Sequence, residues 1–280
     1  MIPIDHAARL SAHDLRVTLD GNQIIPDMTL DIAPGRFTAI VGPNGCGKST
    51  LLRTMIRLLH PSHGEITLDG VNARGLNARG FAKRLALLPQ TAHAPSGITV
   101  RDLVARGRYP HQSLLKQWSS ADHDAVEGAL AATEMTDLGD RLVDDLSGGQ
   151  RQRVWVAMVL AQQTEVVLLD EPTTFLDIAH QHSLLELVRE MVRAQGRTVI
   201  AVLHDLQQAA HYADDLVVMR AGTVISHGPP AEVLTADLIS DVFGLDCRLV
   251  VDEASGASMI IPNPAPPPDL SSIPPLITKP

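Results

Sequence analysis

Residues 42–50 read GPNGCGKST, and this stretch decides the fold more than any other part of the chain. It satisfies the pattern G-x-x-x-x-G-K-[ST], follows an apolar run that ends at Val41, and precedes a helical run from Leu51 to Leu58. Glycines let successive backbone N–H groups curl around an anion, and the positive end of the following helix dipole points at the same place. Because the strand–loop–helix context is present, a chance match in a glycine-rich turn is a poor explanation. The stretch predicts a phosphate-binding loop.

Two side chains in this loop carry most of its predicted chemistry. The Lys48 ammonium is expected to bridge the β- and γ-phosphates of a nucleotide, and the Ser49 hydroxyl is expected to ligate Mg²⁺. Cys46 lies near a helix N-terminus, which favours the thiolate, so we expect a lowered pKa and a thiol that reacts with maleimide. The loop residues predicted to contact nucleotide are Gly42, Pro43, Asn44, Gly45, Cys46, Gly47, Lys48, Ser49 and Thr50.

Short apolar runs recur on both sides of the loop. Continuous rather than alternating apolarity is typical of strands that are covered on both faces, as in a parallel sheet with flanking helices. Helical patterns lie between the runs, and the pattern from Ile178 to Gln195 is followed by Gly196, where a C-terminal cap belongs. We therefore predict an α/β fold with a parallel sheet. The runs are Phe37–Val41, Leu85–Leu88, Val166–Leu169, Val199–Leu203 and Leu216–Met219.

Two regions depart from this alternation of strand and helix. Residues 15–19, 28–32 and 64–70 alternate in polarity like half-exposed strands, so we predict an N-terminal antiparallel β subdomain. Residues 98–145 show charged and helical patterning without a convincing strand, which predicts a helical insertion subdomain.

The composition restricts the class of protein. The chain has 280 residues, 45% of them hydrophobic, with a net charge of −9 and two cysteines, which excludes wholesale disorder and a disulfide-stapled fold. Net negative charge disfavours nucleic acid as a partner. No apolar run approaches the roughly 18 residues of a membrane span, and the first residues do not resemble a secretory signal. We expect a soluble, acidic, cytoplasmic protein, with a disordered proline-rich tail at residues 262–280.

An acidic pair follows one of the apolar runs. Asp170 and Glu171 come directly after Val166–Leu169, and adjacent carboxylates at the end of a buried strand are costly unless a cation sits there. Beside a phosphate loop, we expect Asp170 to hold the Mg²⁺ shell. Glu171, one residue further on, is expected to direct a water molecule as the general base.

A third motif points to a family. Residues 146–153 read LSGGQRQR and introduce an apolar helix, with Ser147 placed as its N-cap and two bare glycines beside it. Together with the phosphate loop and Asp170-Glu171, this motif resembles the signature of the ABC-type ATPases. In that resemblance Gln90 (LLPQ) matches the Q-loop, residues 173–177 (TTFLD) match the D-loop, and His204 (VLHD) matches the switch histidine.

The resemblance implies an architecture and an assembly. It covers residues 12–261 and implies a P-loop NTPase core of the RecA-like type, with the helical subdomain at about 98–145. Two chains are expected to pack head to tail as a homodimer around two ATP molecules. On one side of each ATP the implied residues are Lys48, Ser49, Gln90, Asp170, Glu171 and His204, of which Ser49, Gln90 and Asp170 surround Mg²⁺. From the partner chain the implied residues are Ser147, Gly148, Gly149 and Asp177.

More local stretches narrow the transported substrate. Residues 98–112 followed by Trp118, residues 157–162 and residues 243–247 resemble the ATPases of iron–siderophore importers, with those for ferric enterobactin and ferric dicitrate nearest. The resemblance implies separate membrane permease subunits, a periplasmic or lipid-anchored substrate-binding protein, and a peripheral location on the cytoplasmic face of the membrane. Residues 106–112, together with Gln90, are expected to lie on the permease-facing side of the helical insertion. Charge reversal at Arg108 is therefore expected to reduce uptake more than the ATPase rate of the isolated protein. The sequence does not name the siderophore.

Two alternatives remain open. The first alternative is an importer of haem or cobalamin, because such importers use similar ATPases. An ABC ATPase that acts on nucleic acid is less well supported. The repair ATPases of this superfamily carry zinc-binding cysteine clusters, which two widely spaced cysteines cannot form. The chromosome-type members separate their two halves with a very long coiled coil, whereas Lys48 and Ser147 are only 99 residues apart. A single ATPase unit also differs from the paired units of translation factors.

One expected feature is missing. Members of the family usually place an aromatic ring in the first strand to stack on adenine, and Leu19 occupies that position here. Base–aromatic stacking is worth about 1–3 kcal/mol, so we expect weak discrimination between ATP and GTP.

Overall fold

A parallel sheet forms the centre of the molecule. The computed structural model describes residues 7–112, 118–253 and 256–264. The sheet has six strands in the order β11-β10-β4-β9-β8-β7, parallel except for the edge strand β11. Strands β4, β8 and β9 are buried along their whole length, which explains their continuous apolar sequences. The predicted α/β fold is confirmed. The strands are β4 (Phe37–Val41), β7 (Leu85–Leu88), β8 (Val166–Asp170), β9 (Thr198–Val202), β10 (Asp215–Arg220) and β11 (Thr223–Gly228).

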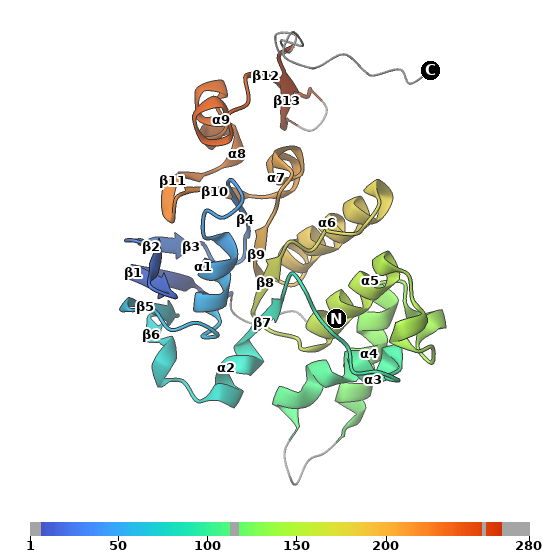
Figure 1. The fold of residues 1–280 in the computed structure, drawn as a ribbon. Helices are drawn as coiled ribbons and strands as arrows, with labels where there is room; N and C mark the ends of the chain where they lie inside the picture. The colour runs from blue at the N-terminus through green and yellow to red at the C-terminus, as the bar shows by residue number, and fades with distance from the viewer. Residues whose placement is uncertain (1–6, 113–117, 254–255, 265–280) are drawn as a thin grey trace, which may run out of the picture.

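The N-terminal region folds as an antiparallel sheet, as predicted. Its five strands lie beside helix α1 (Lys48–Met55) and form the blue and cyan layer of Figure 1. One core cluster lies between this sheet, α1 and one face of the parallel sheet, while a second cluster fills the opposite face under the helices. The strands are β1 (Leu10–Leu19), β2 (Asn22–Ile25), β3 (Leu30–Ile32), β5 (His63–Leu68) and β6 (Val71–Asn72).

The predicted helical insertion is present between β7 and β8. Helices α3, α4 and α5 pack against one another, and a single isolated bridge between Thr99 and Leu142 is the only β pairing recorded within the described part of 98–145. The elements are α3 (Val100–Ala105), η2 (Arg106–His111), α4 (Ser120–Ala132), η3 (Thr136–Leu138), η4 (Val143–Asp145) and α5 (Gly148–Ala161). None of the helices within residues 7–112, 118–253 and 256–264 has the length and apolarity that crossing a membrane requires.

The expectation that Arg108 lies on a permease-facing surface is wrong, because the residue is buried. Only 4% of this residue is accessible, and its guanidinium donates to Asp122 Oδ1 at 2.9 Å and to the Ala161 carbonyl at 2.7 Å. Asp122 belongs to α4 and Ala161 ends α5, so Arg108 ties three parts of the helical region together. A buried ion pair of this kind has a structural function.

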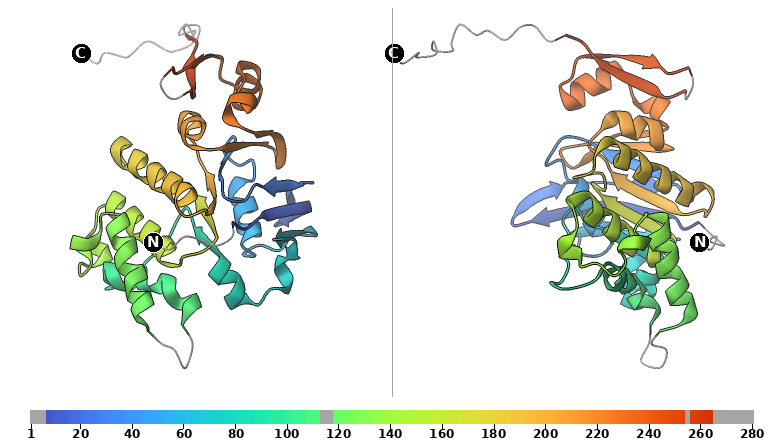
Figure 2. Two further views of the ribbon diagram at one scale, coloured as in Figure 1. Left: turned by 180° about the vertical axis from the view of Figure 1, so that it is seen from behind. Right: turned by 90° about the vertical axis from the view of Figure 1, so that its right-hand side faces the viewer.

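Helices α6 (Ile178–Arg193) and α7 (Leu206–Tyr212) follow β8 and β9. As predicted, Gly196 adopts a left-handed conformation (φ +67°) just after α6. The chain then continues through α8 (Pro230–Val233) and α9 (Ala236–Phe243) to a hairpin of β12 (Cys247–Val251) and β13 (Ser258–Pro262), seen at the top of Figure 2.

The predicted tail begins too early. Pro262 pairs with Cys247 as the last residue of β13, and the Asn263 amide donates to the Asp246 carbonyl at 2.9 Å. The ordered hairpin therefore extends past residue 261. Residues 265–280 of the expected tail lie outside the described residues.

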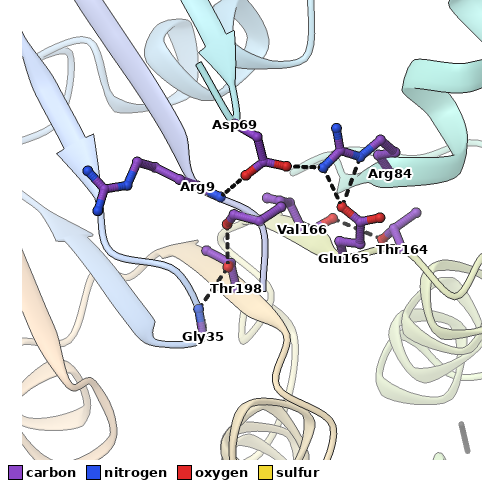
Figure 3. Close-up of polar contacts among 9 residues, drawn as sticks. Arg9, Gly35, Asp69, Arg84, Thr164, Glu165, Val166 and Thr198 are labelled. Atoms are coloured by element: carbon purple, nitrogen blue, oxygen red, sulfur yellow. Dashed lines mark hydrogen bonds and ion pairs between the residues drawn. The ribbon is translucent and has the colours of Figure 1, made fainter. Parts of the chain in front are cut away.

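Polar contacts join the two sheets at the edge where the parallel strands begin (Figure 3). Asp69, in the turn after β5, accepts from the Arg9 amide at 2.9 Å and also pairs with the guanidinium of Arg84, the last residue of α2 (Ala78–Arg84). Arg84 donates to Glu165, just before β8, at 2.6 and 2.8 Å. Thr198 at the start of β9 donates to the Ala8 carbonyl at 2.7 Å. These contacts hold the antiparallel sheet against the parallel one.

Candidate functional site

The phosphate loop connects β4 to α1 and depends on glycine for its shape. Gly42 has φ +155°, and a Cβ atom there would lie 2.2 Å from the Met219 carbonyl oxygen. Gly47 precedes α1 with φ +102°, and no side chain caps the first N–H groups of the helix. These donors are available to an anion at the start of α1.

Lys48 is the first residue of α1, and its side chain folds back over the loop. The residue is 5% exposed, and Nζ donates to the carbonyl oxygens of Gly42 at 2.7 Å and Pro43 at 3.0 Å. The ammonium is therefore held at the loop by two neutral acceptors.

Asp170 ends β8 opposite the start of α1. The Ser49 hydroxyl donates to Asp170 Oδ1 at 2.8 Å, and the carboxylate is almost fully buried. Burial raises the pKa of Asp170, with the nearby Glu171 charge acting in the same direction and the Ser49 hydrogen bond opposing it. A buried carboxylate beside a hydroxyl is an oxygen donor set that suits a hard cation such as Mg²⁺. The residues present therefore fit the predicted magnesium site.

Glu171 lies at the centre of the site. Its Oε2 accepts from Gln90 Nε2 at 2.6 Å, and its Oε1 lies 2.6 Å from His204 Nε2. Gln90 follows β7, Glu171 follows β8 and His204 follows β9, so the parallel sheet brings the three to one edge. The backbone of Glu171 has φ +54°, a conformation that non-glycine residues rarely adopt and that is often found at functional sites.

These groups surround a hollow of about 490 Å³ in front of the phosphate loop. It brings together most of the residues predicted for one side of a nucleotide, on four separate segments. Asp170 and the Pro43 and Cys46 side chains do not line it. The lining residues are Ile24, Asn44, Gly45, Gly47, Lys48, Ser49, Thr50, Gln90, Glu171 and His204.

The other predicted site residues lie away from the hollow. Ser147 is the N-cap of α5, as predicted, and its hydroxyl accepts from the Gln150 amide in a capping box. Gly148 and Gly149 form the first turn of that helix. Asp177 is the exposed N-cap of α6 and accepts from the His180 amide at 2.9 Å, which lowers the pKa of the Asp177 carboxyl. None of these four residues lines the hollow of the same chain.

The prediction for the Cys46 thiol is wrong in direction. Burial raises its pKa, outweighing the nearby Lys48 charge, and its side chain packs in the core under the antiparallel sheet. A helix start alone does not expose a thiol. We therefore expect slow reaction with maleimide.

Three functional candidates were not anticipated from the sequence. Ile24 of β2 lines the hollow, whereas Leu19 does not and is instead partly buried beside the core. Phe175 and Ile178 are 80% and 85% exposed, next to Asp177. No local pattern connects Ile24 to a phosphate loop that begins at Gly42, so the sequence offered no signal for the first. Apolar side chains around an exposed acidic cap could have indicated the other two.

Comparisons with known proteins agree with this geometry. A family model described as "ABC transporter" matches residues 25–174. The ferric enterobactin transport ATP-binding protein of Escherichia coli strain K12 is 49% identical over 92% of this chain and 95% of its own length. A siderophore transport system ATP-binding protein of Bacillus subtilis strain 168 is 48% identical, over 86% and 87%. A solved metal-chelate type ABC transporter in an inward-facing conformation superposes with a TM-score of 0.77 at 27% identity, over 93% of this chain and 98% of that one.

Proposed function

This chain belongs to the ABC transporter family, and we propose that it is the ATPase subunit of an importer of ferric siderophores. Two findings support the substrate class. Relatives named for siderophore transport are 48% and 49% identical over most of the chain. The similar solved structure is of the metal-chelate type. The unit proposed for this activity spans residues 12–261, with its helical subdomain at about 98–145.

The nucleotide is proposed to lie in the hollow, with its phosphates on the N–H groups of residues 42–50. When the nucleotide binds, the Lys48 ammonium releases the carbonyl oxygens of its own loop and neutralises the β- and γ-phosphates. Ser49, Asp170 and Gln90 would hold Mg²⁺, which would neutralise phosphate charge.

Glu171 is proposed as the general base. It accepts a proton from the attacking water, while His204 and Gln90 hold its carboxylate in place through the 2.6 Å contacts on either side. The observation that carries the proposal is this convergence of Gln90, Glu171 and His204 in front of a phosphate loop. Each comes from the end of a different strand, and all three line the same hollow.

The second half of each ATP site is proposed to come from a second copy of the chain. Ser147, Gly148 and Gly149 offer N–H groups at the start of α5 but lie away from their own chain's hollow. The partner's signature would complete the site, together with Asp177. The exposed side chains of Phe175 and Ile178 beside Asp177 are suited to burial in such a contact. ATP binding closes the pair and hydrolysis releases it.

A permease is proposed to dock in a groove of about 510 Å³ between α1, α2 and β7. The groove is largely apolar, and Leu58 at its rim is 66% exposed. Pro89 lines this groove and the next residue, Gln90, lines the catalytic hollow, so the chain connects the two directly. Docking there places the chain at the cytoplasmic face of the membrane, with a substrate-binding protein supplying the chelate from the other side.

Uptake measurements test the substrate class. In cells lacking this gene, the wild-type chain should restore uptake of radiolabelled ferric siderophore, and Glu171→Gln should not. Cobalamin and haem uptake should be unchanged by either. Restoration of cobalamin or haem uptake instead would assign the chain to one of those importers. Failure to restore any uptake by a chain that hydrolyses ATP would contradict the import function.

A further inference from the structure

Two glutamine side chains outside the hollow connect the segments that lead into α6 and α7. The first segment, 173–177, begins two residues after Glu171. The second comprises His204 and Asp205. Helices α6 and α7 pack against each other, as Figures 1 and 2 show from different sides.

Gln181 lies in the early part of α6 and binds the first segment. Its Nε2 donates to the carbonyl oxygens of Leu176 at 3.0 Å and Thr173 at 3.3 Å. Because both partners can only accept, the orientation of the amide follows from the network: the NH₂ group faces the segment and Oε1 is left to accept.

Gln208 completes the connection from α7. Its Nε2 donates to Gln181 Oε1 at 2.6 Å, and its backbone N–H donates to Asp205 Oδ1 at 3.1 Å. Asp205 is bonded to His204, whose Nε2 contacts Glu171 at 2.6 Å. The contacts therefore form a closed ring that starts and ends at Glu171.

The first segment requires such support. Phe175 has φ +68° and an exposed side chain, so neither its backbone preference nor packing of its ring explains the conformation. Backbone in a rarely populated region persists only where its surroundings determine it. The two hydrogen bonds from Gln181 flank Phe175 on both sides.

We propose that Gln181 and Gln208 are positioning residues that fix His204 and the 173–177 segment relative to each other. The proposal rests on the function proposed above, in which His204 acts on the ATP of its own chain and Asp177 contacts the ATP of the partner. The glutamine pair then links the two ATP sites of the dimer, because movement of 173–177 at one site shifts His204 at the other.

Steady-state ATP hydrolysis by the full-length chain tests this. Gln208→Leu should lower kcat about tenfold and leave the KM for ATP within about twofold, because a misplacement of about an ångström costs up to about a hundredfold in rate. Gln207→Leu is the matched control. Gln207 is the neighbouring residue on α7, but it bonds to the β13 backbone, at 3.2 Å to the Ser258 carbonyl and 2.9 Å from the Ile260 amide. Its kcat should match the wild type.

A second measurement compares the kcat of a double variant with that of a single variant. Gln181→Leu combined with Gln208→Leu should be no slower than Gln181→Leu alone, because the two side chains act as a pair. Additive losses, an unchanged kcat in Gln208→Leu, or equal losses in Gln207→Leu would overturn the proposal. Glu171→Gln separates this from the site assignment. If Glu171→Gln is inactive while Gln208→Leu is normal, only the bridge fails; if Glu171→Gln is active, the proposed base itself fails.

Discussion

The two edges of the parallel sheet carry polar residues on the same three strands but arrange them in opposite ways. Where the strands begin, Arg84 precedes β7, Glu165 precedes β8 and Thr198 starts β9, and each is matched by a partner. Where the strands end, Asp170 accepts from the Ser49 hydroxyl, and Glu171 lies between Gln90 and His204. The nearby Lys48 bonds to neutral carbonyls instead.

The difference distinguishes a stabilising edge from a chemical one. At the starting edge one guanidinium pairs with two carboxylates, so each carboxylate has a cationic partner within the chain. At the other edge a buried carboxylate with a raised pKa and a strained Glu171 are retained, which costs stability. The carboxylates of that edge contact hydroxyl, amide and imidazole groups rather than a guanidinium.

Glu171→Gln should give the largest effect and distinguish the edges most clearly. Loss of a general base lowers ATP hydrolysis by about 10²- to 10⁴-fold, while the amide keeps the shape needed for ATP binding. The matched control is Glu165→Gln, the same substitution at the other end of β8. It should leave kcat within about twofold. ATPase assays on both variants decide the matter, and comparable rates would remove the distinction.

Arg84→Met should lower the free energy of unfolding by about 1–3 kcal/mol, because it removes the one guanidinium that pairs with two partly buried carboxylates. Urea denaturation measures this. Arg79→Met, on the same helix, loses one hydrogen bond to the Pro110 carbonyl and should cost less. If Arg84→Met were as stable as the wild type but hydrolysed ATP slowly, this edge would not be the stabilising one.

Asp170→Asn should raise stability in the absence of nucleotide. Removing the charge relieves the desolvation that raises the pKa of Asp170, while the amide oxygen still accepts from Ser49. A gain of about 0.5–2 kcal/mol is typical of such functional positions. Thermal denaturation should show the gain without ligand and a smaller Mg-ATP stabilisation than in the wild type. A less stable variant would mean that Asp170 is already compensated.

The smallest expected effect concerns how the site holds the adenine or guanine ring of the nucleotide. Because Leu19 lies outside the hollow and the apolar Ile24 lines it, ATP and GTP should bind with similar affinities. Ile24→Tyr should tighten ATP by up to about tenfold, since 1.4 kcal/mol is one decade. Ile24→Ala should weaken both nucleotides by a similar factor, because Ile24 lines the hollow. Titrations with both nucleotides measure this. A strong ATP preference in the wild type, unchanged in Ile24→Tyr, would mean that another part of the chain holds the adenine ring.

The ending edge was largely predictable from the sequence, and the starting edge was not. Glycine spacing, continuous apolar strands and an acidic pair are local signals, and they predicted the phosphate loop, β8 and the order of elements around them. The partners of Arg84 lie 15 and 81 residues away, so no local pattern indicates them. The prediction for Arg108 was wrong for the same reason, because its contact with Asp122 depends on how α3, η2 and α4 pack. The prediction of a lowered pKa for Cys46 was wrong because the sequence does not show which way a loop side chain points.

The most direct test of the account is the mass of the Glu171→Gln chain in solution with Mg-ATP, measured by light scattering. A site completed by a second copy predicts a monomer without nucleotide and a species of twice that mass with Mg-ATP. Adding Gly148→Arg, which blocks the start of α5 while leaving the hollow of its own chain intact, should return the monomer. A Glu171→Gln chain that binds ATP and remains a monomer at saturating Mg-ATP would contradict the account.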